Sequence, residues 1–191
     1  MSPLRPNEDV VTRWQTLRRE PLADCRIFRI HRAHKRHPRT QSLFDFYTIE
    51  CPDWVNVVAT TPEKELILVG QYRHGSDTIE WEIPGGIIDP EDANPVEAGL
   101  RELREEAAYL GGRARRIGDV FPNPAIQNNR CHTVRVEDCL PTASQDLDST
   151  EDIVVRLVPW KEAPQLIRSG LFRHSLVVVA LTQALMDDGT W

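Results

Sequence analysis

The sequence has few of three features, and each shortage argues against one class of protein. Long apolar runs are missing, since a stretch such as Leu176–Leu181 is far shorter than the ~20 residues that cross a bilayer. Cysteine is limited to four residues without a C-x-x-C spacing, so we expect free thiols. Positive charge is in deficit, at 23 Lys and Arg against 29 Asp and Glu, which disfavours nonspecific binding to nucleic acid. We therefore expect a cytoplasmic protein with no nucleic-acid or membrane partner.

The chain of 191 residues has the length of one domain with a small extension. A short helix is predicted over Glu8–Arg19, where Asn7 can cap the start and Pro21 breaks the pattern. Two further helices are predicted near the end of the chain, over Lys161–Ser169 and His174–Met186. Strand-like segments are predicted over residues 27–30, 44–50, 55–60, 65–72, 113–121, 131–139 and 153–158.

Many strands with few helices, not in strict alternation, indicate an α/β protein of the α+β kind with a mixed sheet. The antiparallel segments of the first ~50 residues stand apart from the rest. We therefore predict an N-terminal extension over residues 1–52, made of a short helix and strands, and a main domain over residues 53–191.

The most informative segment is an acidic helix that is predicted from Pro95 to about Tyr109 and capped by Asn94. One stripe of this helix is apolar. Another face gathers three carboxylates, and Arg101 lies beside them, where it can brace one of them. Hard oxygen ligands at this spacing suit Mg²⁺ or Mn²⁺, whereas the plainer interpretation is an acidic surface with one ordinary ion pair. The three carboxylates are those of Glu102, Glu105 and Glu106.

Residues 81–109 resemble the signature of the Nudix hydrolases, G-x5-E-x7-R-E-U-x-E-E-x-G-U, in which U is a bulky apolar residue. The run from Arg101 to Glu106 matches the core of the motif position by position, with Gly86 as the opening glycine. The resemblance implies an α/β/α sandwich with a mixed sheet and a Mg²⁺ site, with Mn²⁺ as an alternative metal. It implies catalytic roles for Arg101 and Glu105. The metal ligands that it implies are Glu102, Glu105, Glu106 and the carbonyl of Gly85.

Two departures from the motif are visible. Between Gly86 and Arg101 lie 14 residues where the motif has 13, so the first acid of the motif falls on Asp92 or on Ala93, with Glu91 nearby. Ala108 replaces the second glycine of the motif, although Gly111 and Gly112 follow and can end the helix. We interpret both departures as a loop variant that keeps the metal-binding carboxylates.

Segments around this motif resemble the ADP-ribose and nucleoside-diphosphate-sugar pyrophosphatases: the strand that ends in Gln71-Tyr72-Arg73, the run Trp81–Gly86, and the later Thr150–Ile153. This branch implies Mg²⁺-dependent hydrolysis to a nucleoside monophosphate and a sugar phosphate. It implies substrate binding by Arg73 and Glu82, although Glu82 could instead pair with Arg101. The general base would be Glu151, with Asp152 or a helix glutamate as alternatives. A homodimer through the N-terminal strands is also expected.

Three other interpretations stay open at this stage. The chain could be a non-catalytic Nudix-like module that senses nucleotides, or a housecleaning nucleoside triphosphate hydrolase. The basic stretch Arg29–Arg39 carries three histidines, for which a solvated hairpin is favoured over zinc binding. The segment from Phe121 to Arg130 is rich in amides that suit sugar or base edges, or that stabilise a turn-rich connection. Trp54 and Trp81 are expected in the core rather than stacked on a base.

Overall fold

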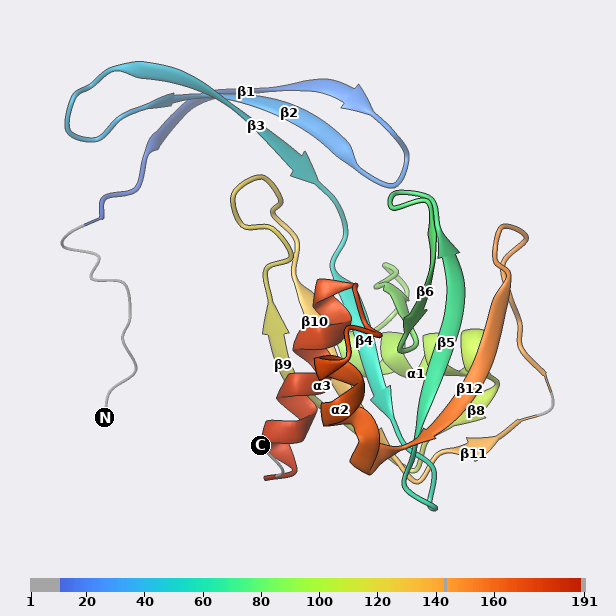
Figure 1. Cartoon of the computed structure of the whole chain (residues 1–191). Coiled ribbons are helices and arrows are strands. Elements are labelled where there is room, and N and C mark those ends of the chain that lie inside the picture. Colours follow the sequence, from blue (N-terminus) through green and yellow to red (C-terminus); the bar gives the residue numbers. More distant parts are fainter. Residues whose placement is uncertain (1–10, 143, 190–191) are drawn as a thin grey trace. The chain divides into compact units, whose positions relative to one another are not determined.

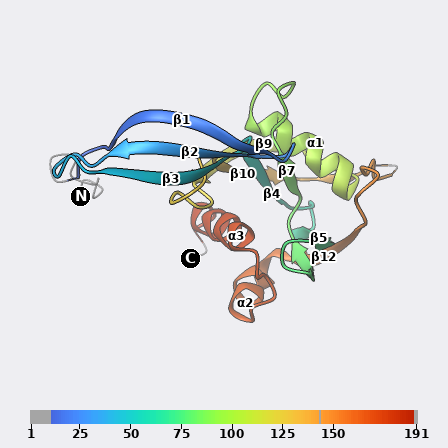
Figure 2. The ribbon, with the colours of Figure 1, turned by 90° about the horizontal axis from the view of Figure 1, so that it is seen from above.

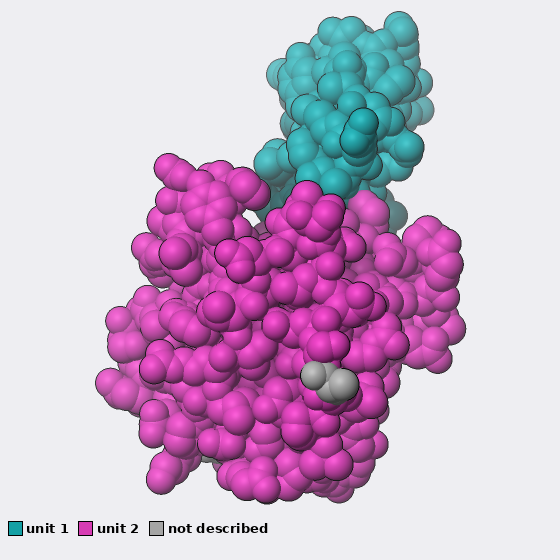
Figure 3. Space-filling model, turned by 90° about the vertical axis from the view of Figure 1, so that its right-hand side faces the viewer, with its two compact units in different colours: residues 1–51, 123–128 teal, residues 52–122, 129–191 magenta. Residues whose placement is uncertain are grey.

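The computed structural model describes residues 11–142 and 144–189, and the chain forms two compact units (Figure 3). Unit 1 extends to Cys51 and also takes in Asn123–Asn128. Unit 2 consists of Pro52–Pro122 and of the chain from Asn129 onward. A segment from the second half of the sequence thus belongs to the N-terminal unit.

Unit 1 is an antiparallel sheet of three strands in the order β1-β2-β3, which lie side by side in Figures 1 and 2. Its inserted segment is joined to the sheet through a bridge between Ile49 and Gln127. The Asn128 side chain accepts a hydrogen bond from the backbone N–H of Cys51 at 3.3 Å, which favours a connecting role for this amide-rich segment. The strand bounds are β1 (Gln15–Asp24), β2 (Arg29–Arg36) and β3 (Leu43–Glu50).

The helix predicted over residues 8–19 is wrong wherever the structure describes it. Residues 11–14 are not helical and β1 begins at Gln15, while residues 8–10 lie outside the described residues. Pro21 lies inside β1 and does not end a helix; a proline fits there because β1 is an edge strand with a bulge between Pro21 and Ala23. An isolated helix of this length is marginal in water, whereas a strand here pairs along all of β2.

The basic stretch lies largely on β2, and acids on the neighbouring strands pair with its charges. Arg29 contacts Asp24 at 3.0 Å, and His31 contacts Glu50 at 3.1 Å. Arg32 pairs with Glu20 on β1. These exposed and half-buried pairs agree with the solvated hairpin that the sequence favours.

Unit 2 is built on two larger sheets and one of two strands, and its α/β architecture confirms the expected fold class. One sheet has the order β7-β4-β10-β9, in which β4 and β10 are parallel and the other pairs antiparallel. The other has the order β12-β5-β6, and β8 pairs with β11. The strands are β4 (Trp54–Ala59), β5 (Glu65–Arg73), β6 (Thr78–Glu82), β7 (Gly85–Ile87), β8 (Tyr109–Leu110), β9 (Arg113–Val120), β10 (Cys131–Glu137), β11 (Leu140–Pro141) and β12 (Ile153–Pro159).

Helices pack on both sides of β4 (Figure 1). Val55, Val57 and Ala59 join the core formed with α1, whereas Val58 joins the core formed with α2 and α3. Successive side chains of a strand point to opposite faces, so Asn56 lies on the α3 side of β4. The helices are α1 (Pro95–Ala107), α2 (Ala163–Arg168) and α3 (Ser175–Asp187), with a 3₁₀ turn, η1 (Trp160–Glu162), before α2. Among the described residues, none of these helices is long and apolar enough to cross a membrane.

The end of α1 differs from the expectation that Gly111 or Gly112 stops the helix. The helix ends at Ala107, and Ala108 takes the left-handed conformation with φ 58° and ψ 41°. The N–H of Ala108 donates to the carbonyl of Arg104 at 3.0 Å. The motif has glycine at this position because glycine adopts a positive φ without steric cost, and the alanine keeps the turn with strain.

Candidate active site

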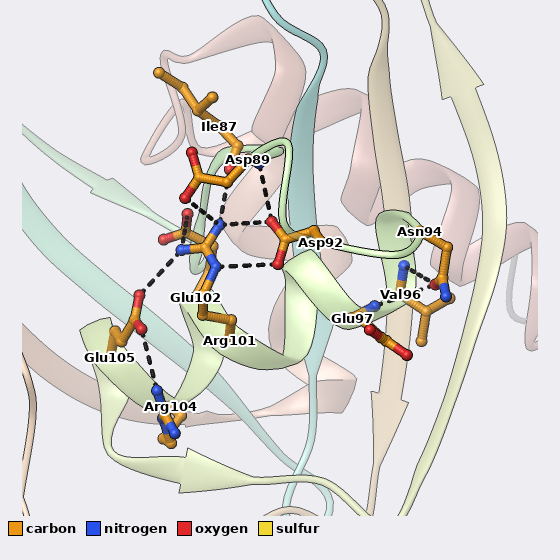
Figure 4. Close-up of polar contacts among 10 residues, drawn as sticks. All are labelled: Ile87, Asp89, Asp92, Asn94, Val96, Glu97, Arg101, Glu102, Arg104 and Glu105. Carbon is orange, nitrogen blue, oxygen red and sulfur yellow. Dashed lines mark hydrogen bonds and ion pairs between the residues drawn. The ribbon is translucent and has the colours of Figure 1, made fainter.

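Helix α1 is fixed at its first turn by the side chain that the sequence predicts. Asn94 Oδ1 accepts hydrogen bonds from the backbone N–H groups of Val96 at 2.9 Å and Glu97 at 3.2 Å (Figure 4). Pro95 occupies the first helical position, where a missing N–H costs nothing. The cap fixes where the helix starts and therefore which carboxylates face strand β7.

Two carboxylates one turn apart are buried against the glycines of β7. Glu102 and Glu106 are 9% and 3% exposed. The N–H of Gly85 donates to Glu106 Oε2 at 2.8 Å. A Cβ on Gly86 would lie 2.4 Å from Glu102 Oε1, so any larger residue at this position would displace the Glu102 carboxylate.

Arg101 organises the acids around these two carboxylates (Figure 4). Its Nη1 donates to Glu102 Oε1 and to Glu105 Oε2, both at 3.0 Å. Its Nη2 donates to the carbonyl of Ile87 at 2.9 Å and to Asp92 Oδ2 at 3.0 Å, and its Nε donates to Asp92 Oδ1 at 3.3 Å. Of the two positions that the sequence leaves open for the first acid of the motif, Asp92 is the one that binds Arg101. Glu105 is turned outward and also accepts from Arg104 at 3.1 Å.

Burial and like charge govern the ionisation of the two inner carboxylates. Burial raises the pKa of Glu102 to about 7, against the lowering effect of Arg101 and with a further increase from Glu105 and Glu151. Burial raises the pKa of Glu106 to about 8; the N–H of Gly85 lowers it, and the charges of Glu102 and Glu151 raise it further. Buried carboxylates that repel one another are stabilised by a positive charge brought next to them.

The donor set fits a hard divalent cation. Carboxylate and carbonyl oxygens are the ligands that Mg²⁺ and Mn²⁺ prefer, and Glu102 and Glu106 supply two carboxylates next to the backbone of Gly85 and Gly86. Within residues 11–142 and 144–189 no three His, Cys, Asp or Glu side chains are gathered into a ready-made site. The carboxylate of Glu105 is engaged by two arginines, Arg101 and Arg104.

Glu82 does not pair with Arg101, which corrects one of the two interpretations of this residue. It is 2% exposed and accepts two hydrogen bonds from Arg73, from Nε and Nη2, each at 2.7 Å. His174 Nδ1 lies 3.0 Å from Glu82 Oε2. Burial alone would raise the pKa of Glu82, but the bonds from Arg73 and His174 outweigh it and lower that pKa to about 2. Sequence reasoning assigns no role to His174, because its partner Glu82 lies far away along the chain.

Two cavities of about 1140 Å³ and about 600 Å³ adjoin this constellation. Glu102, Glu105 and Glu106 line the smaller one, and Trp54 and His174 line the larger one. Both tryptophans are half-buried: Trp81 packs against the core on the α3 side, and Trp54 lies at the wall of the larger cavity. The residues that line both cavities are Gln71, Arg73, Gly85, Gly86, Ile87 and Glu151.

Glu151 lies on the loop before β12, where its Oε2 accepts a hydrogen bond from the backbone N–H of Asp148 at 3.0 Å. Its charge acts on both inner helix carboxylates and on Arg73. Asp152 lines the larger cavity, whereas Glu151 lines both cavities. Of these two acids, Glu151 is therefore the one placed beside the carboxylate cluster.

The NUDIX domain model matches residues 52–177. The chain belongs to the Nudix family. Among curated relatives, an ADP-ribose pyrophosphatase of Bacillus subtilis is 28% identical over 63% of this chain and 65% of its own length. An ADP-ribose pyrophosphatase of Mycobacterium tuberculosis is 25% identical over 88% of this chain and 81% of its own length. A CMP-5'-(N-acetyl-N-hydroxy-3-aminopropyl)phosphonate hydrolase of Streptomyces rubellomurinus is 23% identical over 91% of this chain and 82% of its own length.

The fold of this Nudix hydrolase is also that of a solved structure, the crystal structure of an ADP compounds hydrolase. The TM-score is 0.82 at 21% sequence identity, over 95% of this chain and 98% of the other. At this identity the likeness shows the fold. Membership of the Nudix family and the relation to ADP-ribose pyrophosphatases confirm the resemblance that the motif from Gly86 to Tyr109 indicates.

Proposed function

We propose that this Nudix hydrolase cleaves the pyrophosphate bond of a nucleoside diphosphate linked to a sugar, with ADP-ribose as the first candidate and nucleotide sugars such as GDP-mannose next. One observation carries the proposal: the buried pair Glu102 and Glu106 lies against Gly85 and Gly86, which also line a cavity large enough for a nucleotide. The curated relatives that hydrolyse ADP-ribose support the choice of substrate class.

The residues that would hold Mg²⁺, or Mn²⁺ in its place, are Glu102, Glu105, Glu106 and the carbonyl of Gly85. A divalent cation held there would polarise the pyrophosphate and lower the pKa of a bound water. Arg101 keeps two of these carboxylates in position through one nitrogen, while Asp92 and the carbonyl of Ile87 hold the other side of its guanidinium. We assign Arg101 this positioning role in catalysis.

Glu151 is proposed as the general base. Water adds to one phosphorus, and its proton passes to the Glu151 carboxylate. The bond from that phosphorus to the bridging oxygen breaks, and the oxygen leaves with the other phosphate. The products are a nucleoside monophosphate and a sugar phosphate. Arg73 and Glu82 form one wall of the larger cavity, where they are proposed to contact the substrate.

A substrate screen tests the proposed function. ADP-ribose, GDP-mannose, ADP-glucose, UDP-glucose, diadenosine polyphosphates, a CMP-phosphonate conjugate and nucleoside triphosphates are incubated with the protein and Mg²⁺, and the products are separated by chromatography. We expect turnover of a sugar-linked diphosphate to a monophosphate and a sugar phosphate. Preference for triphosphates would favour a housecleaning hydrolase. Tight binding without turnover of any compound would favour a nucleotide-sensing module.

Amide substitutions separate the base from the metal ligands. We expect Glu151→Gln to lower kcat by ~10²–10⁴-fold with KM and metal affinity nearly unchanged, because the lost interaction forms along the reaction coordinate. Glu106→Gln should keep the fold and lose activity that excess Mg²⁺ or Mn²⁺ partly restores. Asp152→Asn is the matched control; a large drop in Asp152→Asn with none in Glu151→Gln would transfer the role to Asp152.

We also propose that the protein is a homodimer formed through unit 1. Three apolar side chains of β3 are well exposed: Leu43 at 63%, Phe44 at 49% and Tyr47 at 56%. Within the described residues the sheet ends at β1 on one side and at β3 on the other. The unpaired backbone N–H and C=O groups of such edge strands favour pairing with another chain.

A further inference from the structure

The loop between β11 and β12 binds the last backbone carbonyls of α1. Carbonyl groups at the end of a helix have no partner within the helix and need donors from elsewhere. The N–H of Asp146 donates to the carbonyl of Glu105 at 3.0 Å, and Gln145 Nε2 donates to the carbonyl of Glu106. The N–H of Thr142 donates to the carbonyl of Ala108 at 2.6 Å. This loop therefore supplies donors that the carboxyl end of α1 needs.

Gln145 joins both ends of the loop with one side chain. Besides the carbonyl of Glu106, its Nε2 binds the carbonyl of Ile153 at 3.3 Å, where β12 begins. An amide NH₂ group carries two hydrogens, so Gln145 can donate to both carbonyls at once. We call these two hydrogen bonds the Gln145 clamp. The clamp closes residues 146–152 into a loop whose entry, exit and supporting helix meet at one side chain.

Glu151 lies within the segment that the Gln145 clamp closes. Its Oε2 accepts a hydrogen bond from the N–H of Asp148 at 3.0 Å, and its own N–H donates to the carbonyl of Asp148 at 2.9 Å. Leu147 packs against the core that includes α1. Glu151 itself is exposed, so its position relative to α1 depends on how the loop is held and not on burial of its own side chain.

The Gln145 clamp is attached to the residues of the proposed metal site. The backbone carbonyls of Glu105 and Glu106 hold the loop, while the side chains of both belong to the proposed set of metal ligands. Glu151 lines the smaller cavity together with these two glutamates. Gln145 is not among the residues that line either of the two cavities. It can therefore affect the reaction through the placement of Glu151, without contact with the substrate.

A general base acts only when it is correctly placed. It must lie within hydrogen-bond reach of the attacking water, and a displacement of about 1 Å can cost roughly 10²-fold in rate. Ser149 and Thr150, which precede Glu151, are exposed, so packing of the loop tip contributes little to holding it in place. Restraint from the ends of the loop, where Gln145 lies, is therefore needed.

We propose that Gln145 is a positioning residue for hydrolysis, because its amide holds the loop that carries Glu151 on the carboxyl end of α1. The role of Glu151 as the base rests on the proposed function, whereas the clamp is a property of the loop itself. Since Gln145 acts through the base and leaves the substrate-binding walls untouched, its loss should lower kcat and leave KM nearly unchanged.

Hydrogen exchange tests the Gln145 clamp without a substrate. Backbone amide exchange of the full-length protein is followed by mass spectrometry in peptides that cover residues 144–153. Gln145→Met keeps the length of the side chain and removes both donors. We expect the loop amides to exchange roughly tenfold faster or more, because local opening costs less free energy once the ends of the loop are released.

Three comparisons accompany this measurement. Amides of α1 should exchange at the wild-type rate, since the clamp binds carbonyls of the helix and not its N–H groups. Gln145→Glu keeps the shape of the amide, loses both donors and should also speed exchange of the loop. Gln165→Met on α2 is the matched control, because it replaces an exposed glutamine outside the loop, and it should behave like wild type.

Steady-state kinetics with Mg²⁺ and the substrate that the screen selects show whether the clamp acts through Glu151. Gln145→Met should lower kcat by roughly tenfold, with KM and the half-saturating Mg²⁺ concentration within about twofold of wild type. In a Glu151→Gln background the same substitution should change kcat by less than about twofold, because the group that it displaces is already absent. A purely structural role would lower kcat by the same factor in both backgrounds.

The outcomes distinguish the clamp from the proposed function. Faster loop exchange in Gln145→Met, together with no turnover of any compound by wild type, would overturn the proposed function and uphold the clamp. Loop exchange at the wild-type rate would show that Gln145 does not hold the loop. A loss of kcat that persists in the Glu151→Gln background, or that excess Mg²⁺ restores, would show that Gln145 does not act through Glu151.

Discussion

Glu82 joins two segments that lie far apart in the sequence. Its buried carboxylate accepts the fork of Arg73 on β5 and contacts His174 just before α3. Removing one member of this buried ion-pair network leaves a buried charge unpaired. The resulting loss of folding free energy is larger than the net stabilisation that the intact network provides. Glu82 therefore fixes the wall of the larger cavity and couples its integrity to the stability of unit 2.

The ionisation of Glu82 gives this coupling a definite pH dependence. The carboxyl has a pKa of about 2 in the folded protein against an ordinary value of 4.5, so its stabilisation is present above about pH 4.5 and is lost as the pH falls towards 2. We expect Glu82→Gln to lower the free energy of unfolding by about 3 kcal/mol at pH 7 and by less than half of that at pH 3. Urea denaturation of both proteins at the two pH values measures the difference. A gap that stays constant with pH would contradict the assignment.

Single residues show where sequence reasoning succeeds and where it ends. The motif selects Glu102 and Glu106 because both obey a local spacing on one helix, and the structure buries both beside the glycines that the motif also contains. Of the two alternatives for Glu82, the pairing with Arg101 is wrong, and the bonds of Glu82 to Arg73 and His174 are not predicted. Both depend on contacts between strands and helices that are distant in the sequence, and a local pattern carries no signal for them.

At the scale of elements, the end of α1 allows a direct measurement of strain. Ala108 holds a left-handed conformation that costs an alanine more than a glycine. We expect Ala108→Gly to raise the free energy of unfolding by about 0.5–1 kcal/mol, since relief of the strain exceeds the added flexibility of the unfolded chain. The matched control is Ala107→Gly inside the helix, which should lower it by about 1 kcal/mol or more. Destabilisation by both changes would show that Ala108 is not strained.

Predictions of elements succeed where a hydrophobic period meets clear start and stop signals. The helix from Pro95 is confirmed to within two residues because Asn94 and Pro95 mark its start. The helix over residues 8–19 failed because apolar spacing near 3.6 in so short a segment does not exclude a strand, and pairing with β2 decided its structure. The position of the extra residue between Gly86 and Arg101 cannot be predicted from the sequence, because a loop lacks the hydrophobic periodicity that aligns the residues of a helix with the motif.

At the scale of the whole molecule, the proposed homodimer makes a quantitative prediction. Light scattering at micromolar concentration should give about twice the chain mass of 21.9 kDa. Tyr47→Glu on β3 should shift the mass towards 21.9 kDa, because a charge on a buried contact is costly. Leu140→Glu changes a similarly exposed apolar side chain of unit 2 and should leave the dimer intact. A wild-type protein that stays monomeric would overturn the proposal.

The parallel pairing of β4 with β10 has a consequence for the time course of folding. Trp54 pairs with Cys131, so the central ladder of unit 2 closes after β5, β6, the acidic helix and β9 have all been synthesised. Parallel pairs of high sequence separation form slowly, because the entropy of closing the intervening chain is lost before their contacts form. Until then, the edge of β4 that pairs with β10 stays open on the growing chain. A stall in translation between these strands would therefore expose this protein to aggregation more than the same stall after β10.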